Sequence, residues 1–382
     1  MIKYGLYLDI FIYIVNNMIK NKCTLLIDGN WLLISRFSIM KNLFDSNNNE
    51  RELNIAKEKL KDMLAMSIFT VLRRLPEVDN IILISDGGSW RKNLPIPHQL
   101  EDITYKGNRS HGGEMAWNYI FKAFNELSDA CQANGITTCH EFDVEGDDWC
   151  WYWSRYLNDQ NINCIIWTSD HDLIQLVREN TYSSVVWYNE RSNISTTYIP
   201  ESMQETKPDP GDFDFFMQPI KYKSPIIESF LNKMNKINYI NPDSIINEKV
   251  ICGDSGDNIK SVARIMKNDR CYGVGKSDWK KISDKYNINT IQDLINHIDD
   301  VSESITHIKK FKDVPIDDVQ ELIRYNIQLV WLDKSTIPQE IQDRMRSVEY
   351  KTIDIEYFKG SYKTLLGNNE PETQEIMNIF ES

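Results

Sequence analysis

The stretch Cys23-Thr-Leu-Leu-Ile-Asp28 is a short apolar run that ends in an acid, and the same pattern returns twice. The later copies are Asn80-Ile-Ile-Leu-Ile-Ser-Asp86 and Asn163-Cys-Ile-Ile-Trp-Thr-Ser-Asp170. Between the first two, apolar residues recur at helical spacing over about 53–75. Continuous apolar strands joined by helices indicate a parallel sheet that is buried on both faces. Right-handed crossovers bring the carboxyl ends of such strands to one edge, so the three terminal acids are predicted to share one rim.

The rest of the chain divides by its patterning. We expect further helices at about 114–133, 147–156 and 173–178, and further strands at 137–142 and 184–188. The Pro- and Asp-rich stretch 207–212 is a predicted linker, and beyond it helical and charged patterns dominate. The predicted organisation is an N-terminal extension at 1–20, an α/β domain at 21–206 and a mainly helical domain at 207–382.

Composition and charge limit the function. With 382 residues, 41% hydrophobic and 26% charged, the chain is neither disordered nor collagen-like. A net charge of −13 argues against general coating of nucleic acid or anionic membrane but leaves room for a local basic groove. Seven cysteines without metal-binding spacing indicate a reduced, cytoplasmic chain.

The N-terminus is apolar from Tyr4 to Ile19 but is interrupted by Asp9 and by Asn16 and Asn17. This segment is too short and too broken to span a bilayer, so no membrane association is expected. Two interpretations stay open: a short amphipathic helix packed on the body, or a segment that precedes a translation start at Met18.

Acidic residues gather in short clusters at the ends of the predicted elements. Carboxylates crowded at one rim repel each other unless cations neutralise them, and oxygen ligands without His or Cys favour Mg²⁺ or Mn²⁺ over zinc. So many acids are best matched to two divalent ions acting on a phosphodiester. Singly, each acid could instead be a turn residue, a helix cap or a helix N-terminal charge. The nine residues are Asp28, Asp86, Glu145, Asp147, Asp148, Asp170, Asp172, Asp254 and Asp257.

Two basic segments accompany the acids. Tyr105-Lys-Gly-Asn-Arg109 follows the second strand-end acid, and Lys106 and Arg109 would share a face if this segment were helical. Such a pair could stabilise charge on a phosphate, although a solvated basic loop is the alternative. The stretch 260–281 carries seven basic against two acidic side chains. Within it, 273–276 reads as a turn that opens a helix, whose backbone N–H groups can hold a phosphate.

Five motifs in a fixed order carry a resemblance to a known family. They are LLIDGN, SDGGSWRKN with a following YKGNRS, VEGDDW, TSDHDLIQL and CGDSGDN, and NIQLVWLD at 326–333 adds a sixth segment. Over about 23–350 the chain resembles the structure-specific 5′-nucleases, which include flap endonucleases and phage 5′→3′ exonucleases, and most of all the phage T4-type ribonuclease H branch. The resemblance implies a PIN-like core, a helical gateway at about 93–125 and a C-terminal DNA-binding domain with a helix–turn–helix (H3TH-like) element.

The resemblance also implies roles for residues. Asp28, Asp86, Glu145 and Asp147 resemble an inner metal set, and the other five acids an outer or shared set. Lys106 and Arg109 would lie above the metals as catalytic residues, with Tyr105 stacked on a terminal base. Further contacts to nucleic acid would come from Arg91, Lys92, Lys260, Arg264, Gly273, Gly275 and Lys276, with a monovalent cation at 273–276. Extra residues between CGDSGDN and the 273–276 turn, which the T4-type branch also has, depart from simple members.

The implied function is a divalent-metal-dependent 5′→3′ exonuclease or flap endonuclease. It would hydrolyse phosphodiesters at 5′ ends of duplex or flap DNA and of RNA–DNA hybrids, in RNase H-type primer removal. Its partners would be these nucleic acids and a single-strand-binding or other replication protein, in the host cytoplasm if the chain is phage-encoded. Two alternatives stay open: a single-strand ribonuclease with a related acid-rich core, and a non-catalytic replication protein that binds branched DNA.

Overall fold

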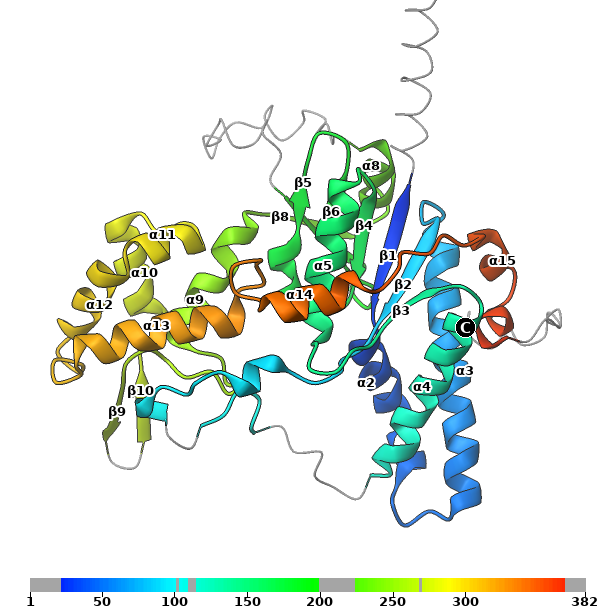
Figure 1. Cartoon of the computed structure of the whole chain (residues 1–382), viewed down its shortest axis with the longest axis horizontal. Coiled ribbons are helices and arrows are strands. Elements are labelled where there is room, and N and C mark those ends of the chain that lie inside the picture. Colours follow the sequence, from blue (N-terminus) through cyan, green and yellow to red (C-terminus); the bar gives the residue numbers. More distant parts are fainter. Residues whose placement is uncertain (1–21, 101–102, 109–114, 199–223, 268–269, 368–382) are drawn as a thin grey trace, which may run out of the picture.

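The computed structural model describes residues 22–100, 103–108, 115–198, 224–267 and 270–367 (Figure 1). The predictions about residues 1–20, the linker at 207–212 and Arg109 lie outside these ranges. No helix within them is long and apolar enough to cross a membrane.

An eight-stranded sheet forms the centre of the molecule, and the three apolar runs supply adjacent strands at its middle, as predicted. Its strand order is β3-β2-β1-β4-β6-β7-β8. The strands from β3 to β6 are parallel, β7 runs antiparallel to β6, and β8 is parallel to β7. A short strand, β5 (Arg178–Glu179), pairs antiparallel with β6. The ordered strands are β1 (Cys23–Asp28), β2 (Asn80–Ile84), β3 (Thr137–Cys139), β4 (Asn163–Trp167), β6 (Ser184–Asn189), β7 (Ile194–Tyr198) and β8 (Lys236–Ile240).

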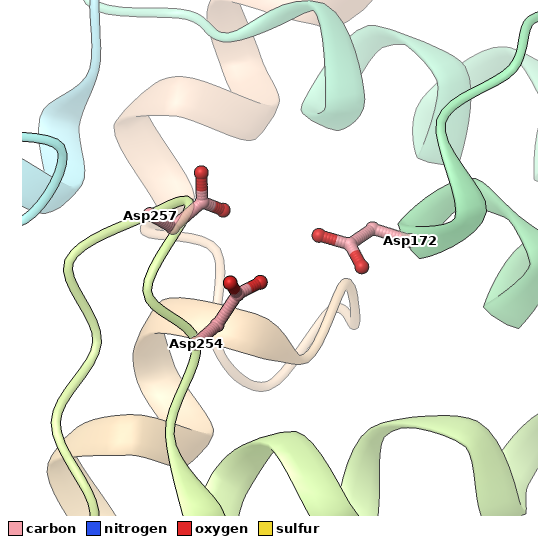
Figure 2. Close-up of side chains that lie close together, drawn as sticks. All are labelled: Asp172, Asp254 and Asp257. Atoms are coloured by element: carbon pink, nitrogen blue, oxygen red, sulfur yellow. The ribbon is translucent and has the colours of Figure 1, made fainter.

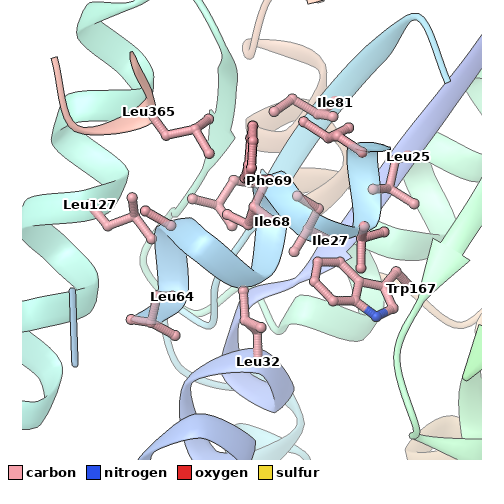
Figure 3. Packing of buried hydrophobic residues seen from close by; sticks show 14 of the residues in the cluster. Leu25, Ile27, Leu32, Leu64, Ile68, Phe69, Ile81, Leu127, Trp167 and Leu365 are labelled. Carbon is pink, nitrogen blue, oxygen red and sulfur yellow. The ribbon is translucent and has the colours of Figure 1, made fainter. Parts of the chain in front are cut away.

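Both faces of this sheet are covered, as the continuous apolar runs require. Along β1, Leu25 and Ile27 belong to a core cluster with the long helices α3 and α4 (Figure 3). Leu26, between them, belongs to a second cluster with α5. On the first face lie α2 (Gly29–Met40), η1 (Lys41–Phe44), α3 (Glu50–Arg74), α4 (Trp117–Ala133), α8 (Pro225–Leu231), α15 (Ile355–Gly360) and η6 (Tyr362–Leu366); on the second lie α5 (Gly146–Asp159), η4 (His171–Leu176) and α14 (Gln339–Arg346).

A smaller helical part lies to one side of the sheet and has a core of its own (Figure 1). It contains α9 (Ile245–Cys252), α10 (Lys276–Tyr286), α11 (Ile291–Asn296), α12 (Ile298–Thr306), α13 (Ile316–Val330) and a hairpin of β9 (Arg264–Lys267) and β10 (Arg270–Gly273). The connecting segments contribute η2 (Trp90–Asn93), η3 (His98–Leu100) and η5 (Pro242–Ser244).

The packing divides the chain differently from the predicted boundary at 206/207. β8 joins the central sheet, and Ile227 and Phe230 of α8 lie in its core. Ile355 and Phe358 of α15 return to that same core from the far end of the sequence. The helical part is therefore inserted between β8 and α14. Composition could not show this, because membership of a core depends on contacts between residues far apart in sequence.

Candidate metal centre and nucleic-acid interface

Four aspartates lie at the carboxyl edge of the sheet, and strand topology was expected to bring three of them there, namely Asp28, Asp86 and Asp170. Asp28 is the last residue of β1 and is paired in register with Ile84 of β2, so Asp86 follows two residues beyond. Asp170 follows the end of β4, the other neighbour of β1. Asp147 enters from the first turn of α5. Their carboxylates influence one another electrostatically, as their pKa values show.

Asp28 is fixed by local geometry. Its Oδ1 accepts a hydrogen bond from the backbone N–H of Trp31 at 3.0 Å, which caps α2, and its Oδ2 accepts one from the Thr168 hydroxyl at 2.7 Å. Burial nevertheless raises its pKa to about 6, and repulsion from Asp86 and Asp170 adds to this shift. A bound cation would remove that cost, because it stabilises the ionised carboxylate.

Asp86 and Asp147 show the same crowding. Asp86 accepts hydrogen bonds from the backbone N–H of Gly146 at 2.5 Å and from the Asn30 amide. Burial raises the pKa of Asp147 well above its ordinary range; Lys106 lowers it, and Asp170 and Asp86 are among the charges that raise it further. Carboxylates held in place at an electrostatic cost are suited to binding positive charge.

A second acidic group spans the junction between the sheet and the helical part. Asp172 from η4 faces Asp254 and Asp257, which follow α9, and the three offer carboxylate oxygens within 4.8 Å of one another (Figure 2). The loop after α9 is folded tightly, since the backbones of Asp254 and Ile259 exchange two hydrogen bonds. Residues more than 80 positions apart thus meet at one point.

Lys249 of α9 lies against this second group, although no sequence motif singled it out. Its ammonium bonds to Asp172 and to Asp254 Oδ2, the latter at 2.5 Å. Burial alone would lower the pKa of Lys249, but Asp172 and Asp254 raise it above its ordinary value. We call Asp172, Asp254 and Asp257 the trio. The Lys249 ammonium is a cation bound by carboxylate oxygens of two of its members, Asp172 and Asp254.

A small cleft connects the two acidic groups, with free space of about 10 Å³, enough for one water molecule. Asp147 lines it from the sheet edge, Asp172 and Asp257 from the second group, and Lys249 and Tyr105 complete its wall. Asp147 of the first group and two acids of the second group therefore face a shared space.

The structure corrects two predicted roles. Arg91 was expected to contact nucleic acid, but its side chain is 1% exposed and its guanidinium pairs with Glu145 at 2.6 Å and Asp148 at 2.8 Å. Asp148 was expected to bind metal, but it is fully buried, and both its oxygens accept hydrogen bonds from Arg91, with a further one from the indole N–H of Trp90. Because these partners use the carboxylate, Asp148 holds the start of α5 in place and does not face the cleft acids. The sequence also assigned Glu145 to the inner metal set; its second oxygen pairs with Lys106 at 2.5 Å.

Residues 105–108 form a turn, whereas Lys106 and Arg109 were expected to share a face only if this segment were helical, and Arg109 lies outside the described residues. Lys106 has a positive φ of 54° and its backbone N–H donates to the carbonyl of Asp257 at 2.9 Å. That bond directs its ammonium toward Glu145 at the acidic rim. Tyr105 was expected to stack on a base, but its ring is only 5% exposed and packs in the helical core with the Lys106 ammonium 4.9 Å above it.

The second basic segment has the predicted turn. α10 begins at Lys276 with Gly275 as its N-cap. Gly273 is required by close packing, because a Cβ there would lie 2.6 Å from Cβ of Ser261. Two of the other residues predicted to contact nucleic acid, Lys92 and Lys276, are exposed, and Lys276 pairs with Glu248. The remaining two bond within the protein: the Lys260 ammonium donates to Asn258, and Arg264 donates to the carbonyl of Gln99.

The site also uses residues that sequence reasoning missed. Asn30 and Thr168 hold Asp86 and Asp28, and both stand inside the motifs that drew attention, beside the acids they support. Lys249 carried no such signal. The donor set fits divalent cations: the ligand atoms are carboxylate oxygens, and in the trio a protein ammonium already occupies a cation's position.

Known proteins share sequence similarity with this chain. A family model described as the 5′-3′ exonuclease, N-terminal resolvase-like domain, matches residues 23–207. A 5′-3′ exonuclease of Mycoplasmopsis pulmonis (strain UAB CTIP) is 26% identical over 332 residues, which are 86% of each chain. The chain is therefore similar to 5′-3′ exonucleases, over 23–207 by the family model and over most of its length by this relative.

Solved structures share the fold. The T5 D15 protein co-crystallised with metal ions has a TM-score of 0.52 at 16% identity, covering 85% of this chain and 97% of that one. The bacteriophage T5 flap endonuclease in complex with DNA and metal ions has a TM-score of 0.52 at 14% identity, covering 91% and 100%. The mostly parallel sheet with flanking helices is thus the fold of these T5 proteins.

Proposed function

We propose that this chain is a Mg²⁺- or Mn²⁺-dependent 5′-nuclease that hydrolyses phosphodiesters at the 5′ ends of duplex or flap DNA and of RNA–DNA hybrids. The observation that carries the proposal is the crowding of Asp28, Asp86, Asp147 and Asp170 at the carboxyl edge of the sheet, beside a cleft that Asp147 lines together with Asp172 and Asp257. Divalent ions held there would activate water and stabilise the leaving oxygen. The task that fits is removal of RNA primers, as in the T4-type branch, in the cytoplasm and alongside a single-strand-binding protein.

The acidic and the basic residues of the chain have different roles in this proposal. The strand-end acids and the trio hold positive charge at the cleft. Lys106 places an ammonium at its rim, where it can stabilise negative charge that grows on a phosphate. Exposed lysines such as Lys276 and Lys280 of α10 offer phosphate contacts outside the cleft. The net charge of −13 favours docking only where this basic surface meets the duplex.

One set of incubations tests the proposal. A labelled 5′-flap duplex, an RNA–DNA hybrid and single-stranded RNA are incubated with Mg²⁺, Mn²⁺ or EDTA. We expect cleavage of the flap and of the hybrid from the 5′ side, only with metal. Cleavage of single-stranded RNA alone would favour the ribonuclease alternative, and binding without cleavage would favour the non-catalytic one.

Two variants connect the activity to the site. Asp170→Asn should reduce the cleavage rate by at least about a hundredfold, since metal ligation supplies several kcal/mol, while duplex affinity changes little. Asp317→Asn, on the exposed start of α13, is the control and should match wild type. Lys106→Ala should lower the single-turnover rate more than affinity; the reverse pattern would make Lys106 a docking residue.

A further inference from the structure

The turn at 273–276 is where family resemblance implies a monovalent cation, and such a cation would be held by backbone carbonyl oxygens. The turn is held in place by contacts with Ser261. The Val274 N–H donates to the buried Ser261 hydroxyl at 2.8 Å, and Gly273 packs against the same serine. Gly275 then caps α10.

A protein ammonium already lies at this turn. The Nζ of Lys310 donates to the carbonyl of Gly273 at 3.3 Å and to Asp278 Oδ2 at 2.9 Å. Asp278 stands in the first turn of α10 and also accepts from the backbone N–H of Gly275, and its pKa is lowered, first by the hydrogen bond from Lys310. The Lys310 ammonium thus supplies positive charge to the carbonyl of Gly273. The carboxylate of Asp278 supplies negative charge to the N-terminus of α10, where the helix dipole favours it.

Lys310 is directed to the turn by its neighbour. Phe311 is fully buried in the helical core, and its backbone N–H donates to the carbonyl of Ile308 at 2.7 Å. This anchor fixes the loop after α12 against α10, and the Lys310 ammonium lies 4.7 Å from the Phe311 ring centroid. The Lys310 side chain itself is 37% exposed. Lys309 and Lys312 are exposed as well, but they have no contact with the turn among the described residues.

We propose that Lys310 is a built-in cation that takes the place of a bound monovalent ion, so that the grip of the 273–276 turn on duplex nucleic acid does not depend on K⁺ or Na⁺. This inference rests on the proposed function, because it assumes that the turn contacts a duplex. It assigns Lys310 as a positioning residue, which acts through the carbonyl of Gly273 and the carboxylate of Asp278. The carbonyl of Gly273 and the carboxylate of Asp278 already bond to the Lys310 ammonium. A second cation would therefore find little negative charge to neutralise at this turn.

The test measures duplex affinity of the full chain by fluorescence anisotropy in EDTA, at one ionic strength, with potassium, sodium or tetramethylammonium chloride. Wild type should bind equally in all three salts. Lys310→Met should lose about tenfold in tetramethylammonium, the size of one charge-assisted hydrogen bond, and recover in potassium, which can enter the emptied position. Lys312→Met removes the same charge from the same loop and should show no dependence on the identity of the cation.

A second measurement needs no nucleic acid. The unfolding midpoint of wild type should be the same in potassium and tetramethylammonium, whereas Lys310→Met should be stabilised by potassium alone. Wild-type binding that requires K⁺, or a Lys310→Met variant indifferent to the cation in both measurements, would overturn the inference and leave the proposed function standing. A wild type that binds no duplex in any salt would instead refute the proposed function, and with it the role of Lys310 in the grip.

Discussion

Replacing Arg91 by methionine should destabilise the fold strongly, because Arg91 is the only cation paired with Asp148 among the described residues. The side chains of Arg91, Glu145 and Asp148 are 1%, 4% and 0% exposed, so water cannot solvate the carboxylates once the guanidinium is lost. Methionine preserves most of the length and the contact with the Trp90 ring, which lies 4.4 Å from the guanidinium carbon. The change therefore isolates the charge.

The expected loss is about 3–5 kcal/mol in the free energy of unfolding, the usual cost of removing one partner from a buried ion pair. Urea unfolding followed by tryptophan fluorescence measures it, and Lys92→Met is the matched control. Lys92 is the next residue in the same 3₁₀ turn, and it is exposed, so its loss should cost less than about 0.5 kcal/mol. Combining Arg91→Met with Asp148→Asn should recover part of the loss, because the second change removes one uncompensated charge.

The result that would refute this reasoning is specific. If Arg91→Met unfolds within about 1 kcal/mol of wild type but binds duplex more weakly and with a shallower salt dependence, then Arg91 contacts phosphate, as the family resemblance had implied. A stability loss with unchanged affinity per folded molecule supports the buried ion pair instead.

Three further changes test other parts of the site. Burial raises the pKa of Asp28 from 3.8 to about 6, so the folded metal-free chain binds this proton more tightly than the unfolded chain. The free energy of unfolding should therefore fall by up to about 3 kcal/mol as pH rises from about 4 to about 6. In urea unfolding with EDTA, Asp28→Asn should flatten this pH dependence. Lys249→Met should raise the affinity of the trio for Mn²⁺ in calorimetry by about tenfold, since the ammonium no longer competes for Asp172 and Asp254; weaker binding would show that Lys249 supports the site. Gly273→Ala should cost about 1–3 kcal/mol by its clash with Ser261, whereas Gly360→Ala, with nothing within 4 Å, should cost far less, and an equal loss in both would contradict the packing argument.

The sequence predicted the parts of the site that follow from short-range pattern. The strand from Cys23 to Asp28 has the predicted bounds, because an uninterrupted apolar run between polar neighbours is a local signal. The meeting of Asp28, Asp86 and Asp170 needed one more rule, the handedness of crossovers, which is nearly invariant. Topology therefore placed these acids without any knowledge of side-chain contacts.

What sequence could not predict depends on partners far along the chain. Arg91 and Lys92 look alike in a polar segment, yet one is buried and the other exposed, because Asp148 lies 57 residues away and only the fold brings it near Arg91. Lys249 could not be recognised as part of the site from sequence, because its partner Asp172 lies 77 residues away. The local pattern of β8 did not stand out in a charged region, and its place beside β7 became visible only in the folded sheet.

The charges of the cleft suggest how so many acids coexist in a folded chain. Each acidic group has an ammonium of the protein against it: Lys106 beside Glu145 at the sheet edge, and Lys249 between Asp172 and Asp254 at the junction. Both lysines come from segments outside the central sheet, and the backbone of Lys106 is bonded to Asp257. The same contacts that neutralise the acids therefore also join the helical part to the sheet. Cation binding at the cleft must compete with these contacts, so metal affinity and the packing of the two parts are expected to be coupled.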